Sequence, residues 1–192
     1  MASLHFYYST MNAGKSSGLL QSSYNYNERG MKTIILKPGV DTREGKAVVR
    51  SRIGLEAECV LFTEEENIFD KVTLLSDSET AAILVDESQF MTPEQVEQLT
   101  DVVDLLDIPV ICYGLRSDFQ GKLFPGSASL FALANRMEEV RTICWCGKRA
   151  TMVLRIDDKG EVVREGNVVV VGGNDKYVSV CRRHFKGGCI SR

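Results

Sequence analysis

The chain has 192 residues, of which 44% are hydrophobic and 26% charged, and its formal net charge is −3. This length suits one ordinary domain, or one domain with a small module, and excludes a large multidomain protein. The average composition excludes a disordered chain, and the slight acidic excess gives no overall basic field to hold a nucleic-acid backbone.

No apolar run approaches the ~20 residues that a membrane-spanning helix needs. The first ten residues lack the cationic start and the long apolar core of a secretory signal. We therefore expect a cytoplasmic protein that contacts no membrane. In that compartment, the six cysteines are expected to be buried thiols, metal ligands or redox groups rather than disulfides.

The first two-thirds of the chain alternates strand-like and helix-like segments, which predicts an α/β fold with a parallel sheet and helices on both faces. Such a sheet binds ligands at the carboxyl ends of its strands. Residues 38–54 are polar and charged without periodicity, which predicts a long mobile loop. Strands are predicted at 4–8, 33–36, 58–62, 81–85 and 109–113, and helices at about 14–28, at 64–75 and from Pro93, capped by Thr92.

From about residue 141 the pattern changes to short β-rich segments separated by Asp-Lys-Gly and Gly-Gly turns. We therefore expect two domains, an α/β domain over residues 1–140 and a small β-rich domain over residues 141–192. Strands of the second domain are predicted at 151–156, 161–164, 168–171 and 177–180.

Residues 9–16 match the phosphate-binding loop G-x-x-x-x-G-K-[ST], except that Ser9 replaces the first glycine. The motif follows an apolar strand and opens a helix, where free N–H groups and the helix dipole attract phosphate. We predict that Lys15 reaches the β- and γ-phosphates of ATP and that the Ser16 hydroxyl ligates Mg²⁺. The alternative is an ordinary turn with a solvent-exposed lysine. The predicted ATP-binding residues of this loop are Ser9, Thr10, Met11, Asn12, Ala13, Gly14, Lys15 and Ser16.

Two adjacent acids end the apolar run at 81–85, which is the Walker B arrangement. Asp86 is predicted to lie at the strand tip and to help hold Mg²⁺. Because adjacent strand residues point to opposite sides, Glu87 is predicted to face a substrate hydroxyl and to act as a general base. The alternative is a pair of acids at a strand-to-helix junction.

Two close pairs of metal-ligand residues lie in the β-rich region, Cys144 with Cys146 and Cys181 with His184. Two turns that each supply two ligands predict a tetrahedral Zn²⁺ site, with core thiols as the alternative. Because protein fills all four positions, the metal is expected to stabilise the fold and to perform no hydrolysis. No function is assigned to His5, Cys59, Cys112 or Cys189.

Four aromatic residues lie in or just after segments expected to end at the ligand-binding edge: Phe90, Phe119, Phe124 and Tyr177. A flat heterocyclic base packs well between aromatic faces, so this set indicates a nucleoside pocket, with core packing as the alternative for each residue. The segment 168–173 either brings backbone groups close to a ligand or turns a hairpin, and the residues alone leave both open.

In their order, these motifs are similar to those of the type II thymidine kinases, close to the enterobacterial-type members. The resemblance covers nearly the whole chain and rests on residues 9–16, 41–43, 86–90, 113–119, 144–146, 171–177 and 181–184. It implies transfer of the γ-phosphoryl group of ATP to the 5′-hydroxyl of thymidine or deoxyuridine in pyrimidine salvage. It also implies a homotetramer, inhibition by thymidine triphosphate, and a zinc-ribbon-like second domain that carries a so-called lasso loop.

The resemblance implies roles for matching residues. Glu87 looks like the catalytic base, while Asp41 and Arg43 look like a mobile-loop pair, with Asp41 on the Mg²⁺ side and Arg43 toward the 5′-hydroxyl. Asp86, Glu87, Ser88 and Gln89 complete the ATP-binding set. The base is expected to lie among Met11, Phe90, Leu115, Phe119, Phe124 and Tyr177. The lasso loop, which holds the pyrimidine edge through backbone hydrogen bonds and so rejects cytosine, is expected to include Val168, Val169, Val170, Val171 and Gly172.

The residues alone also permit an ATP-driven switch protein whose zinc-binding region contacts nucleic acid. That region lacks an extended basic cluster, and its nearby cations Arg182, Arg183 and Lys186 fit a solvated rim, so we expect no nucleic-acid partner. A test of whether ATP turnover requires a nucleoside distinguishes the two functions, since a switch protein hydrolyses ATP equally with or without thymidine.

In the kinase, closure of the loop at 38–54 over the active site is expected to exclude water, which would otherwise compete with the nucleoside for the phosphoryl group.

Overall fold

The structure is a computed structural model and describes residues 1–39, 47–168 and 177–191. The predicted site residues Asp41, Arg43, Val169, Val170, Val171 and Gly172 lie outside these ranges. Within them, no helix combines the length and the apolar character needed to cross a membrane.

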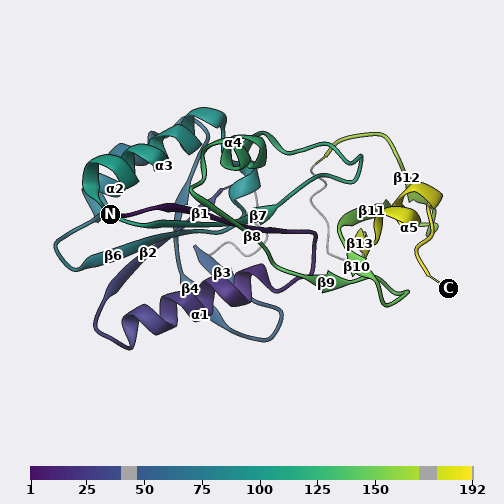
Figure 1. Cartoon of the computed structure of the whole chain (residues 1–192), viewed down its shortest axis with the longest axis horizontal. Helices are drawn as coiled ribbons and strands as arrows, with labels where there is room; N and C mark the ends of the chain where they lie inside the picture. The colour runs from purple at the N-terminus through teal and green to yellow at the C-terminus, as the bar shows by residue number, and fades with distance from the viewer. Residues whose placement is uncertain (40–46, 169–176, 192) are drawn as a thin grey trace.

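The described residues form a central six-stranded sheet in the order β5-β2-β6-β7-β1-β8 (Figure 1). Every pairing in it is parallel, as the alternating sequence pattern predicted. The strands are β1 (Leu4–Ser9), β2 (Lys32–Pro38), β5 (Val60–Phe62), β6 (Thr80–Val85), β7 (Val110–Leu115) and β8 (Arg136–Glu139).

Helices cover both faces of this sheet (Figure 1). On one face lie α2 (Ile68–Leu75), α3 (Pro93–Leu106) and α4 (Pro125–Leu133), and on the other lies α1 (Lys15–Asn27). Alternate residues of β2 and β6 point to opposite faces of the sheet. Ile34 and Ile83 pack against the face covered by α2, α3 and α4, while Ile35 and Leu84 pack against α1. The α/β fold class is therefore confirmed.

The predicted loop at 38–54 is partly wrong, because Val48–Arg50 forms strand β3 and pairs antiparallel with β4 (Glu56–Glu58). Val49 is fully buried beside α1, so tertiary packing rather than a local pattern makes this strand. The predicted strand at 58–62 is also two elements, since the chain leaves β4 before Cys59 and enters β5 of the central sheet after it.

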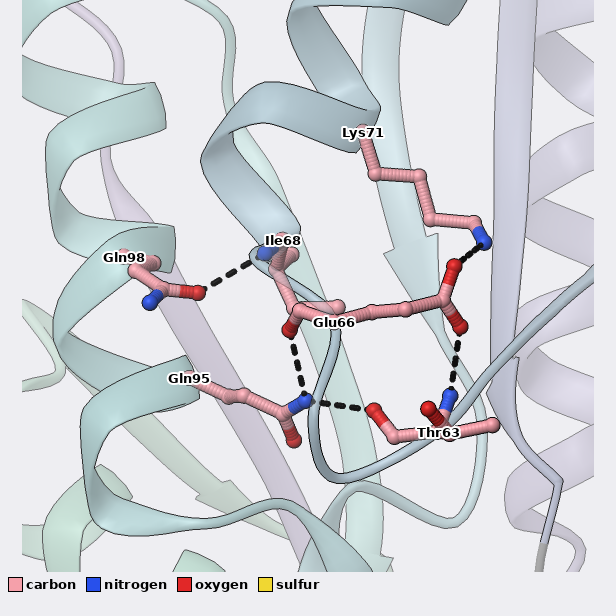
Figure 2. Close-up of polar contacts among 6 residues, drawn as sticks. All are labelled: Thr63, Glu66, Ile68, Lys71, Gln95 and Gln98. Atoms are coloured by element: carbon pink, nitrogen blue, oxygen red, sulfur yellow. Dashed lines mark hydrogen bonds and ion pairs between the residues drawn. The ribbon is translucent and has the colours of Figure 1, made fainter.

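Helix α2 begins at Ile68 rather than at the predicted residue 64, because Asn67 caps it by accepting a hydrogen bond from the Asp70 N–H at 3.1 Å. The turn before it is held by two glutamines of α3 (Figure 2). Gln95 donates to the carbonyls of Thr63 and Glu66 at 2.8 and 3.1 Å, and Gln98 accepts from the Ile68 N–H at 2.7 Å. Helix α3 has the expected Thr92 cap and Pro93 start.

The described residues from Thr142 onward form two small antiparallel sheets and a short helix at the carboxyl ends of the central strands (Figure 1). One sheet is the hairpin of β9 (Thr142–Ile143) and β10 (Arg149–Ala150), and the other has the order β12-β11-β13. The remaining bounds are β11 (Met152–Ile156), β12 (Val162–Val163), β13 (Tyr177–Val180) and α5 (Arg182–Gly187).

Candidate active site

The phosphate-loop motif lies between the end of β1 and the start of α1, as predicted. Two residues take left-handed backbone conformations, Asn12 with φ 61° and Gly14 with φ 85°, and they bend the chain into the helix. The Ser9 side chain donates to the Val140 carbonyl at 2.5 Å. The residue that replaces the first glycine of the motif therefore fastens the loop to the chain that follows β8.

Lys15 is only 9% exposed, in contrast to the exposed lysine of an ordinary turn. Its Nζ donates to the Thr10 carbonyl at 2.8 Å, so the side chain folds back over the loop. Burial lowers the pKa of Lys15, while the charges of Glu87 and Asp86 act in the opposite direction. A buried cation over an N–H-rich loop can bind an anion such as a phosphate.

Ser16 and Asp86 bring a hydroxyl and a carboxylate together from two different elements. Ser16 lies in the first turn of α1, and its Oγ is 3.3 and 3.4 Å from the two carboxylate oxygens of Asp86, which follows β6. Burial, and then the charge of Glu87, raise the pKa of Asp86 to about 7. Hard oxygen ligands at a phosphate loop fit Mg²⁺, which would also stabilise the ionised carboxylate.

Glu87 follows Asp86 but does not continue the strand, because β6 ends at Val85 and Glu87 has a left-handed backbone with φ 51°. The expected alternation of strand side chains therefore does not explain its direction. Its carboxylate is half-buried, and its Oε2 accepts a hydrogen bond from Gln89 Nε2 at 2.5 Å. Gln89 belongs to the short helix η1 (Ser88–Phe90).

The predicted base-binding residues have different environments. Phe90 and Phe124 lie edge to face with their ring centroids 5.7 Å apart, so these two come together as the resemblance implied. Phe119 is 1% exposed beneath the guanidinium of Arg155, 5.3 Å from its ring centroid. Its ring is thus packed as a core residue. Intermediate burial is found for Met11, Leu115 and Tyr177, and Val168 is exposed.

Residues that no motif singled out join the phosphate loop to the C-terminal sheet. Ser179 of β13 donates to the Met11 carbonyl at 2.6 Å and lies 2.7 Å from the Thr10 hydroxyl. Arg116, just after β7, donates to the Thr151 carbonyl. Because Ser179 and Met11 are 168 positions apart, no local signal in the sequence indicates this contact.

The four predicted metal ligands converge, with one ligand atom from each residue lying within 4.8 Å of the others. Cys144 and Cys146 come from the β9–β10 turn, and Cys181 and His184 from the start of α5. The Nδ1 atom of His184 is 3.3 and 3.5 Å from the Sγ atoms of Cys144 and Cys181. Three thiols and an imidazole at this spacing are compatible with a tetrahedral zinc site.

Packing fixes the histidine of this cluster. The Trp145 ring stacks on His184 with centroids 4.1 Å apart and planes 13° apart. The backbone N–H of His184, and after it the thiols of Cys146 and Cys144, lower the pKa of the Cys181 thiol against the opposing effect of burial. Of the remaining cysteines, Cys59 and Cys112 are buried, as expected of core thiols, and Cys189 is exposed.

Comparisons with known proteins agree with the resemblance. The family model described as "Thymidine kinase" matches residues 2–185. The chain is 54% identical to the thymidine kinases of Shewanella oneidensis, over 97% of each chain, and of Haemophilus influenzae, over 98% of each. It is also 54% identical to the thymidine kinase of Salmonella typhimurium, an enterobacterial relative, over 97% of this chain and 91% of that one. The chain belongs to the thymidine kinase family.

Proposed function

We propose that the protein transfers the γ-phosphoryl group of ATP to the 5′-hydroxyl of thymidine, giving thymidine monophosphate and ADP. The observation that carries the proposal is that Ser16 contacts Asp86 while the charges of Asp86 and Glu87 act on the buried Lys15, in a chain of this family. This set offers a cation for the triphosphate, oxygen ligands for its metal ion, and a second carboxylate for a proton.

The triphosphate is proposed to lie along residues 9–16. Lys15 then exchanges its hydrogen bond to the Thr10 carbonyl for the β- and γ-phosphates. Ser16 and Asp86 would hold Mg²⁺, which would supply charge neutralisation at the phosphate oxygens. Since burial and Glu87 disfavour the ionised form of Asp86, an adjacent cation is the natural partner for that carboxylate.

Glu87 is the proposed general base. As the 5′-oxygen forms its bond to the γ-phosphorus, Glu87 accepts the hydroxyl proton. The bond between the γ-phosphorus and the oxygen that bridges to the β-phosphate breaks, and ADP leaves with that electron pair. Positioning of the two substrates, rather than covalent chemistry by the protein, accounts for most of the rate.

The nucleoside is proposed to lie with its base near the Phe90–Phe124 pair, supported by their edge-to-face contact. Recognition of the pyrimidine edge by backbone groups of the lasso loop would admit deoxyuridine as well as thymidine, because the two differ only in a methyl group. The proposed positions of Arg43, near the 5′-hydroxyl, and of Asp41, on the Mg²⁺ side, are based on the resemblance alone. The proposals of a role in cytoplasmic salvage, of a homotetramer and of inhibition by thymidine triphosphate have the same basis.

We propose further that Cys144, Cys146, Cys181 and His184 hold a structural Zn²⁺. Its support is the close approach of the four ligand atoms. A domain boundary near residue 140 is proposed on the change from the parallel sheet, which ends with β8 at Glu139, to the small antiparallel sheets that begin at Thr142.

A phosphate-transfer screen of the purified protein across the natural nucleosides with MgATP tests the function. Thymidine and deoxyuridine are expected to accept phosphate, and ADP formation is expected to need the nucleoside. Glu87→Gln should leave ATP binding intact and lower kcat by about 10²–10⁴-fold. ATP hydrolysis at the same rate with or without thymidine would instead indicate the switch protein.

A further inference from the structure

Gln89 is fully buried next to the proposed base, and both ends of its side-chain amide are used. Its Nε2 donates to Glu87 Oε2 at 2.5 Å, and its Oε1 accepts from the Leu115 N–H at 2.9 Å. With no exposed surface, the side chain has no face to offer a nucleotide. The Gln89 side chain therefore connects the end of β7 to the carboxylate of Glu87 through two hydrogen bonds.

The backbone of β7 fixes which way this amide points. A backbone N–H can only donate, so the Gln89 oxygen must face Leu115 and the nitrogen must face Glu87. Gly114 makes this approach possible, because a Cβ there would lie 2.6 Å from Ser88 Oγ and 3.1 Å from both the N and the Oε1 of Gln89. A side chain at Gly114 would displace the Ser88 hydroxyl and crowd the backbone and the amide of Gln89.

We propose that Gln89 is a positioning residue for the carboxylate of Glu87. One carboxylate oxygen, Oε2, is held by the amide, whereas the described residues donate no hydrogen bond to Oε1. A carboxylate held at one oxygen keeps a fixed orientation and leaves the other oxygen for a proton. This inference rests on the proposed role of Glu87 as general base.

The test is Gln89→Met, which keeps the length and volume of the side chain and removes the donor. We expect kcat to fall about 10–100-fold, as for other lost supports of a reacting group. The KM values for ATP and thymidine should stay within about twofold, because the side chain touches neither substrate. Gln89→Leu is a second variant of similar volume that also lacks the donor, and it should show the same split between kcat and KM.

A double-mutant cycle separates positioning from general damage. In the Glu87→Gln background, Gln89→Met is expected to cause no further loss of kcat, because the oriented base is already absent. An equal loss in both backgrounds would overturn the proposal, and so would a rise in the KM for ATP as the main effect.

The matched control is Gln95→Met. Gln95 is also a buried glutamine with its amide fully used, since it donates to Thr63 and Glu66 (Figure 2) and accepts from the Thr92 N–H. It lies at the start of α3, and none of these hydrogen bonds involves Glu87. This variant should lower the melting temperature and leave kcat unchanged.

Two results distinguish failure of this inference from failure of the proposed function. If Glu87→Gln retains full kcat, Glu87 is not the general base, and the proposed function and this inference fail together. If Glu87→Gln loses activity while Gln89→Met and Gln89→Leu retain it, the proposed function stands and only the positioning role is overturned.

Discussion

Asp86→Asn is expected to stabilise the ligand-free protein much more at pH 8 than at pH 5. Burial and the charge of Glu87 raise the pKa of Asp86 from 3.8 to about 7 in the folded chain. Between these values the folded protein holds a proton that the unfolded chain has lost, so stability falls as pH rises and the full penalty applies above pH 7. Three pKa units correspond to about 4 kcal/mol at about 1.4 kcal/mol each.

Urea unfolding of both proteins at pH 5 and pH 8, without Mg²⁺ or nucleotide, measures this difference. Asp104→Asn, an exposed substitution on α3, is the control and should change little at either pH. At pH 5 the native Asp86 is still protonated and only about one of the three pKa units of penalty applies, so the asparagine variant should gain less than half as much there as at pH 8. A variant that is less stable at pH 8, or equally stabilised at both pH values, would refute the reasoning. Kinase activity should be lost in either case, because the amide is a poor Mg²⁺ ligand.

Three further outcomes are expected. Ser179→Ala removes the hydrogen bond to the Met11 carbonyl, so the KM for ATP should rise and stability should fall by about 1 kcal/mol in urea unfolding; an unchanged KM would count against the link. Cys146→Ser should lower the zinc content from about one ion per chain and alter Trp145 fluorescence, whereas a fully folded, metal-free native protein would exclude the zinc site. Ser88→Ala should raise the free energy of unfolding by about 1 kcal/mol, because the buried Ser88 hydroxyl has no hydrogen-bond partner among the described residues, and a loss of stability would contradict this.

The central strands could be predicted because a parallel strand covered on both faces is a continuous apolar run, as in β6 and β7. The elements that escaped prediction lack such a pattern for physical reasons. Strand β8 lies at the edge of the sheet and is charged, and charge on an edge strand discourages pairing with another chain. Helix α4 is apolar on most sides, so it has no polar face to reveal the helical period.

The α5 helix and the β3–β4 hairpin were missed for a different reason. Helix α5 has only 6 residues, too few for periodicity to appear. In the hairpin, Val49 is fully buried while its neighbours are exposed or half-buried, and what buries it is α1, a distant part of the chain. A charged segment with one buried valine gives the same local signal as a loop.

In the candidate site, too, local sequence patterns predicted some residues, whereas others depend on tertiary contacts. Lys15 with Ser16, Asp86 with Glu87, and the paired metal ligands could be predicted because each pair is adjacent or nearly so in the chain, next to the end of a strand. The residues that orient these side chains could not be predicted from the sequence. Gln89 meets Leu115 only because β7 lies beside η1 without a side chain at Gly114, and that register is a property of the folded sheet. Local motifs therefore indicate which groups act, whereas their orientation depends on contacts that only the fold creates. A variant that spares every motif residue but inserts a methyl group at Gly114 should accordingly lower kcat as Gln89→Met does.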